Sequence, residues 1–139
     1  MLPGDVFTHR NIANIIHPGD INTAAVIEFG VAHLYVQAVV VCGHTCCGGA
    51  DAAMSDGVVG GILDTWLAPL KRIRRDNWES LAPLTDEEAK LKLVEMNVHA
   101  GVKTVRDMPV VQEAMRKGGL KVHGAVYDVG TGALREIEC

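Results

Sequence analysis

The sequence contains 139 residues, of which 48% are hydrophobic and 22% are charged. This length corresponds to one domain, and this composition excludes a disordered chain. Thirteen Lys and Arg against seventeen Asp and Glu give a net charge of −4. A dedicated binder of nucleic acid or anionic membranes is excluded as well, because no dense basic cluster offsets this acidic balance. We therefore expect a single domain over residues 1–139, with neither nucleic acid nor a membrane among its partners.

The four cysteines favour a reducing compartment over a disulfide framework. They stand at positions 42, 46, 47 and 139, so three of them fall within six residues. Adjacent cysteines such as Cys46 and Cys47 make strained disulfide partners. The first residues lack both the basic and the long apolar segment of a secretory signal. We expect a cytoplasmic protein with reduced thiols, and the thiols beside His44 suggest a bound metal.

The first half of the chain predicts two strands separated by a helix. A short strand over residues 5–9 follows the turn at Pro3-Gly4. Asp20 is a suitable N-cap for a helix over about residues 21–34. Residues 36–42 form a nearly continuous β-branched run, which is typical of a parallel strand that is covered on both faces.

The second half predicts three helices and a terminal hairpin. In chain order these are a helix after Gly60-Gly61, a helix that begins with the capping box Thr85-x-x-Glu88, a short helix from Pro109 to Gly118, a strand over residues 120–129, and a last strand ALREI over 133–137. The predicted fold class is therefore α/β, with a mostly parallel sheet flanked by helices and a C-terminal antiparallel hairpin.

The segment between the second strand and the next helix carries candidate metal ligands. His44-x-x-Cys47 places an imidazole and a thiol at the end of a buried strand, where α/β proteins place their sites, and zinc accepts both donors. Gly48 and Gly49 allow the backbone to approach whatever occupies that place. On spacing alone, a buried apolar cysteine remains the alternative reading.

A wider pattern lies around this motif. The segments PGDVFTHRNIAN (3–14), IEFGVAHL (27–34) and VVVCGHTCCGGADAAM (39–54) closely resemble β-class carbonic anhydrases of the fungal type. The later stretches GGILDTWLAPL, LVEMNVHAGV and LKVHGAVYDVGTGALREIE resemble the same family. The resemblance implies a β-carbonic anhydrase fold and a zinc-dependent lyase that interconverts carbon dioxide and bicarbonate by attack of a zinc-bound hydroxide. It also implies a homodimer or a larger homo-oligomer.

The same resemblance implies roles for individual residues. His44 and Cys47 match two of the three protein zinc ligands of the family, and Gly48 and Gly49 match the glycines that line the substrate pocket. The apolar residues of the carbon dioxide cleft are matched by Phe7, Ile12 and Phe29, the last at a position where many relatives carry tyrosine.

One family motif is absent from residues 1–139. In relatives, a strand ending in Cys-x-Asp-x-Arg precedes the Pro-Gly-Asp turn and supplies the first zinc ligand and an Asp-Arg dyad, whereas here Pro3 follows Met1-Leu2 directly. We therefore expect a domain that is short at its N-terminus, and we assign no catalytic residue. A zinc site needs three protein ligands plus water for catalysis.

Two alternatives stay open beside the carbonic anhydrase reading. The chain is either a zinc-poor, weakly active or silent homologue with an interaction or regulatory role, or a relative acting on carbonyl sulfide. Cys42, two residues before His44 on the same face of its strand, is the leading candidate for a replacement ligand. Packing as a small apolar side chain is the preferred interpretation of Cys42.

Overall fold

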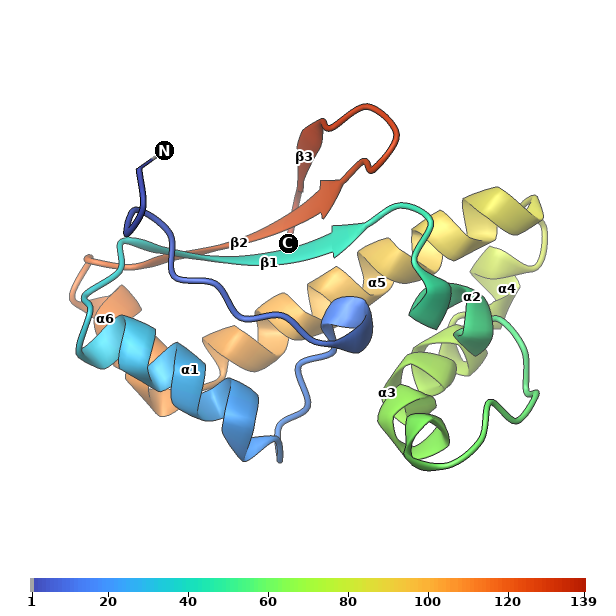
Figure 1. Cartoon of the computed structure of the whole chain (residues 1–139), viewed down its shortest axis with the longest axis horizontal. Coiled ribbons are helices and arrows are strands. Elements are labelled where there is room, and N and C mark those ends of the chain that lie inside the picture. The colour runs from blue at the N-terminus through green and yellow to red at the C-terminus, as the bar shows by residue number, and fades with distance from the viewer. Residues whose placement is uncertain (1) are drawn as a thin grey trace.

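The chain folds as a three-stranded sheet with its helices gathered on one side (Figure 1). The computed structural model describes residues 2–139, so Met1 of the predicted domain lies outside the described residues. The elements in chain order are the 3₁₀ turn η1 (Ile12–Asn14), α1 (Ile21–Ala32), β1 (Ala38–His44), α2 (Gly48–Ala53), α3 (Ile62–Asp76), α4 (Trp78–Leu81), α5 (Asp86–Arg106), α6 (Pro109–Arg116), β2 (Lys121–Tyr127) and β3 (Leu134–Ile137).

The sheet is mixed, with strand order β1-β2-β3. β1 and β2 pair in parallel, in a register that runs from Ala38 opposite Lys121 to His44 opposite Tyr127. β3 returns antiparallel to β2, with Ile137 opposite Gly124. The predicted α/β class and its C-terminal antiparallel hairpin are confirmed.

Two helix starts follow the predicted caps. The Asp20 carboxylate accepts a hydrogen bond from the Asn22 backbone N–H at 3.0 Å and begins α1. At α5 the capping box is complete, since the Thr85 hydroxyl accepts from the Glu88 N–H and the Glu88 carboxylate accepts from the Thr85 N–H. The short elements η1 and α4 were not predicted, because each is too brief to produce a hydrophobic period.

Helix α5 covers the inner face of the sheet. Its buried stripe includes Leu93, Val98, Val102 and Val105, each at most 1% exposed. Gly43 of β1 faces this stripe, and a Cβ there would lie only 2.7 Å from the Val94 side chain. The close approach of β1 to α5 therefore requires glycine immediately before His44.

Two predictions for the N-terminal half are wrong. Residues 5–9 do not form a strand, because among the described residues they have no neighbouring strand with which to form a ladder. β1 is covered on one face only: Val41 is buried against the helices, whereas Val40 on the opposite face is 53% exposed. Within residues 2–139, β1 therefore has one uncovered face, and the edge that does not pair with β2 is open.

Candidate metal-binding site

The candidate ligands lie at the carboxyl end of β1, where the chain turns into α2. His44 is the last residue of β1. Its Nδ1 atom lies 2.8 Å from the Thr45 backbone oxygen. Because a carbonyl oxygen only accepts, the proton must be on Nδ1, which leaves the lone pair on Nε2. His44 is therefore held in the tautomer that presents Nε2 to a metal.

The two adjacent cysteines differ in their surroundings. Cys47 is 8% exposed and belongs to the main apolar core at the N-cap position of α2. Cys46 is exposed, with a backbone φ of 56°. Residues other than glycine and asparagine rarely adopt this left-handed backbone conformation. The bend at Cys46 therefore separates an outward thiol from an inward one.

Gly49 is packed tightly against the turn η1. A Cβ at Gly49 would lie 2.7 Å from the Ala13 Cβ and 3.6 Å from Ile12 Cγ2. At Gly48, by contrast, nothing lies within 4 Å of such a Cβ. The structure thus brings Ile12 beside the loop of residues 44–49, called the metal loop below, and leaves open space at Gly48.

Two side chains that the sequence did not single out as functional hold η1 in this place. The Trp66 indole N–H donates to the Ile12 carbonyl at 2.9 Å, and the Asn97 side-chain amide donates to the Ala13 carbonyl at 2.8 Å. Ala13 and Asn14 both have positive φ, at 58° and 44°. The two hydrogen bonds stabilise this left-handed backbone conformation, which residues other than glycine rarely adopt. The Ile12 carbonyl lies 54 residues from Trp66 in the sequence, so this hydrogen bond leaves no local sequence signal.

The other two predicted cleft residues form a separate aromatic pair. The Phe7 and Phe29 ring centroids lie 6.0 Å apart at an interplanar angle of 51°. Each ring is 49% exposed, and His33 stacks on Phe29 with a centroid distance of 5.4 Å. Phe7 also lies against Gly30 of α1. The predicted pocket residues therefore fall into an exposed aromatic group at α1 and a second group at the metal loop.

The donors present fit part of a zinc site. His44 and Cys47 are of the nitrogen and sulfur types that zinc binds, with one ring nitrogen free and the thiol unpaired. Within residues 2–139, no three His, Cys, Asp or Glu side chains gather into a possible metal-binding group. Cys42, the candidate replacement, is exposed, donates to the Gly43 carbonyl at 3.3 Å and has a thiol pKa raised by burial of its sulfur.

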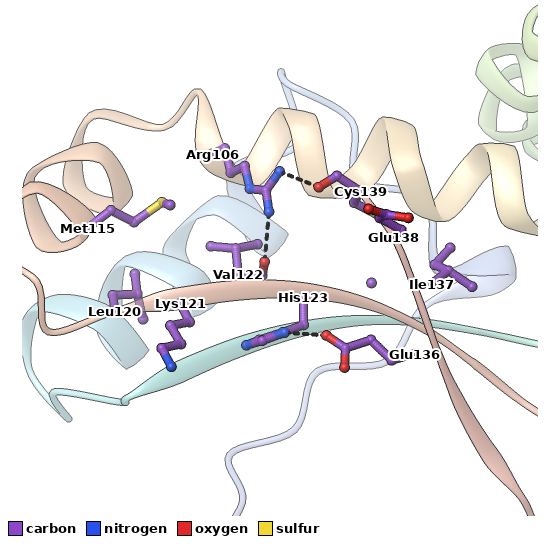
Figure 2. A pocket seen from close by; sticks show the side chains of 11 residues that line it. Arg106, Met115, Leu120, Lys121, Val122, His123, Glu136, Ile137, Glu138 and Cys139 are labelled. Carbon is purple, nitrogen blue, oxygen red and sulfur yellow. Dashed lines mark hydrogen bonds and ion pairs between the residues drawn. The ribbon is translucent and has the colours of Figure 1, made fainter.

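A cavity of about 590 Å³ opens elsewhere, between the end of α5, β2 and the segment after β3. Figure 2 shows Arg106 bridging this region, where it donates to the Val122 and Cys139 carbonyls at 3.0 and 3.1 Å. The cavity contains none of the predicted metal or pocket residues. It is therefore not part of the candidate site.

Comparison with known proteins identifies the family. The family model described as carbonic anhydrase matches residues 1–134. A carbonic anhydrase of Candida albicans is 42% identical over 99% of this chain, and one of Emericella nidulans is 37% identical over 96%. Among solved structures, a tetrameric β-carbonic anhydrase of Sordaria macrospora superimposes with a TM-score of 0.97 at 51% identity, covering 100% of this chain and 71% of that one. The β-carbonic anhydrase CafA of Aspergillus fumigatus gives a TM-score of 0.96 at 53% identity, covering 99% of this chain and 66% of that one.

The fold and the metal loop thus define an α/β protein built like these enzymes, and the chain belongs to the carbonic anhydrase family, in its fungal β-class form. It spans 50% of the Candida relative and 59% of the Emericella relative. Of the helices in residues 2–139, none is long and apolar enough to cross a bilayer.

Proposed function

We propose that this chain supplies the core of a zinc-dependent carbonic anhydrase, interconverting carbon dioxide and bicarbonate. The observation that carries the proposal is the state of His44, whose Nδ1–H is donated to the Thr45 carbonyl while Nε2 is left free. The buried thiol of Cys47 follows three residues later at the start of α2. The high similarity to fungal β-carbonic anhydrases supports the same assignment.

In this proposal His44 and Cys47 hold the zinc. Zinc, when bound, supplies a Lewis acid that lowers the pKa of a coordinated water to about 7. Ile12 and the open space at Gly48 then provide an apolar place for a small, uncharged substrate beside the metal. Phe7 and Phe29 add apolar surface at α1, and their exposure leaves room for a further segment or subunit to close the pocket over them.

In this proposal the third zinc donor comes from beyond residues 2–139, in which no three possible ligands gather. β1 pairs on one edge with β2, and its other edge is open within residues 2–139. An additional strand along that edge would bring a donor to the carboxyl end of β1, next to His44. This is where the family resemblance expects the strand that ends in Cys-x-Asp-x-Arg.

A homo-oligomer is also part of the proposal. Val40 and Leu134, on the sheet, are 53% and 63% exposed, and exposed apolar sheet surface is commonly covered by a partner. The similar Sordaria protein is described as tetrameric. Sedimentation velocity at micromolar concentration tests this: a dimer or larger assembly is expected, and a folded monomer would contradict it. All four cysteines are unpaired thiols, which supports the cytoplasm as the compartment.

Stopped-flow carbon dioxide hydration on protein of measured zinc content tests the activity. Turnover that scales with bound zinc and disappears in His44→Ala is expected. A longer form that binds one zinc per chain, yet does not hydrate carbon dioxide, would contradict the proposed function and favour a silent homologue.

A further inference from the structure

We infer that Thr45 is a positioning residue for the metal site: its hydroxyl couples the β2–β3 hairpin to the tautomer of His44. The inference deepens the proposed function and rests on it, since it assigns the device that keeps Nε2 of His44 available to zinc. Thr45 is the x of the His44-x-x-Cys47 motif that follows the histidine, and nothing in the spacing of ligands explains why a hydroxyl stands there.

Three hydrogen bonds meet at this one residue. The Thr45 carbonyl accepts from His44 Nδ1 at 2.8 Å. The Thr45 N–H donates to the Tyr127 carbonyl at 2.9 Å, which continues the β1–β2 ladder by one residue. The Thr45 hydroxyl accepts from the Val129 N–H at 3.0 Å, across 84 residues of sequence. Thr45 is therefore tied at its amide and its side chain to two residues that flank the start of the hairpin turn.

The hairpin turn is itself a fixed anchor. The Asp128 carboxylate accepts from the Gly130 and Thr131 N–H groups at 2.8 and 3.1 Å. The Asp128 backbone is closed onto the turn as well, donating to the Ala133 carbonyl and accepting from the Gly132 N–H, both at 2.8 Å. Val129 therefore presents its N–H to Thr45 from a turn that is held from both sides.

The hydroxyl matters because the backbone after Thr45 leaves the strand conformation at once. Thr45 and Cys46 form a turn directly after β1, and Cys46 has a φ of 56°, so the chain leaves the ladder here. The carbonyl that His44 needs belongs to the peptide between Thr45 and Cys46. The bond from the Val129 N–H fixes Thr45 immediately before the turn, and so fixes the direction of that carbonyl toward the imidazole. Partners of this kind set which nitrogen of a ligating histidine carries the proton, and their loss typically costs 10- to 100-fold in metal affinity or activity.

The test reads the His44 tautomer directly, on metal-free protein of residues 1–139 with ¹⁵N-labelled histidine. The variants are Thr45→Val, which keeps the shape and removes the hydroxyl, and Thr45→Ser, which keeps the hydroxyl. Wild type is expected to hold His44 with its proton on Nδ1, and to protect the Val129 amide from hydrogen exchange. Thr45→Val is expected to lose that protection and to mix the two tautomers, while Thr45→Ser restores both signals.

Thr131→Val is the matched control. The Thr131 hydroxyl accepts from the Ala133 N–H at 3.3 Å in the same turn, and within residues 2–139 it makes no hydrogen bond to Thr45, so this variant should leave His44 unchanged. A folded Thr45→Val protein with the wild-type tautomer would overturn the inference. A wild-type His44 that carries its proton on Nε2 would also overturn the inference, without any variant.

A second readout is the zinc affinity of a form extended by an upstream strand that ends in Cys-x-Asp-x-Arg. Thr45→Val is expected to lower this affinity 10- to 100-fold, and Thr45→Ser is expected to leave it unchanged. Absence of carbon dioxide hydration would contradict the proposed function while leaving the tautomer result intact. The converse also holds, so the two failures are distinguishable.

Discussion

Asn97, buried in the middle of α5, donates its side-chain amide to the carbonyl of Ala13 at 2.8 Å, across 84 residues of sequence. This bond ties the turn that carries Ile12 to the helix that covers the sheet. Ala13 is itself buried, at 7% exposure, so its carbonyl depends on this partner rather than on water.

Replacing Asn97 with alanine should therefore lower the free energy of unfolding by about 1–3 kcal/mol, because a buried acceptor is left unsatisfied. Urea denaturation measures the change. Gln112→Ala is a suitable control, since Gln112 is an exposed amide on α6, and it should change stability by less than about 0.5 kcal/mol. Equal effects of the two substitutions would show that the bond to Ala13 contributes nothing.

The capping box of α5 predicts a pH dependence. The Thr85 hydroxyl and N–H, both bonded to the Glu88 carboxylate, hold the pKa of Glu88 below its ordinary value. A carboxyl group whose pKa is lower in the folded state stabilises the protein above its unfolded pKa, and this contribution is lost as the pH falls through the folded pKa.

Glu88→Gln should accordingly be less stable than wild type at pH 7. The difference should shrink as the pH falls from the ordinary glutamate pKa of about 4.3 toward the lower pKa of the folded state, because the wild-type carboxylate loses its charge over this range. Thermal unfolding across this pH range measures it. Glu87→Gln, a neighbour in the same first turn with no side-chain hydrogen bond within residues 2–139, should show no such convergence. A constant difference between Glu88→Gln and wild type would mean that ionisation of Glu88 is irrelevant to the cap.

The sequence predicted much of this fold because several of its signals are local. The capping box at Thr85 and the N-cap at Asp20 are each contained in a few residues, and both formed as expected. The prediction that β1 is covered on both faces was wrong for a physical reason. A β-branched residue such as Val40 looks the same in the sequence whether or not a helix of its own chain covers it. The strand over residues 5–9 failed because a strand needs a neighbour, which composition does not reveal.

The candidate site divides in the same way. His44 and Cys47 were found from their residue types and spacing, together with the family resemblance. The groups that position them were not, because Thr45 acts through Val129, and Asn97 through Ala13, each across 84 residues. Such pairs become visible only when the chain is folded.

The two adjacent cysteines should differ in their effect on zinc. Cys47 is buried at the start of α2, whereas Cys46 is exposed at a left-handed bend, so the two thiols lie in different surroundings and we expect only Cys47 to reach the metal. Cys47→Ser should abolish tight zinc binding, and Cys46→Ser should leave the zinc content nearly unchanged. Thiolate-to-metal charge-transfer absorption with cadmium in place of zinc reads the same distinction. Equal losses in both variants would show that Cys46 also ligates.

Residues 1–139 on their own should bind zinc weakly. They offer His44 and Cys47 as donors, and no described group of three possible ligands includes them. A catalytic zinc site has three protein ligands and one water, so the missing thiolate and its neighbours should cost at least 10- to 100-fold in affinity. Competition with a chromophoric chelator measures the zinc affinity of this polypeptide against a form extended by an upstream strand ending in Cys-x-Asp-x-Arg.

The extended form should bind zinc tightly and hydrate carbon dioxide, and serine in place of the added cysteine should return it to the weak level. This control separates the effect of the donor from that of filling the open edge of β1, because the strand is present in both proteins. Strong zinc binding and robust turnover by residues 1–139 alone would contradict the prediction. Cys42→Ser would then be the first variant to make, since Cys42 shares the outer face of β1 with His44, and its raised thiol pKa would have to fall on binding a metal.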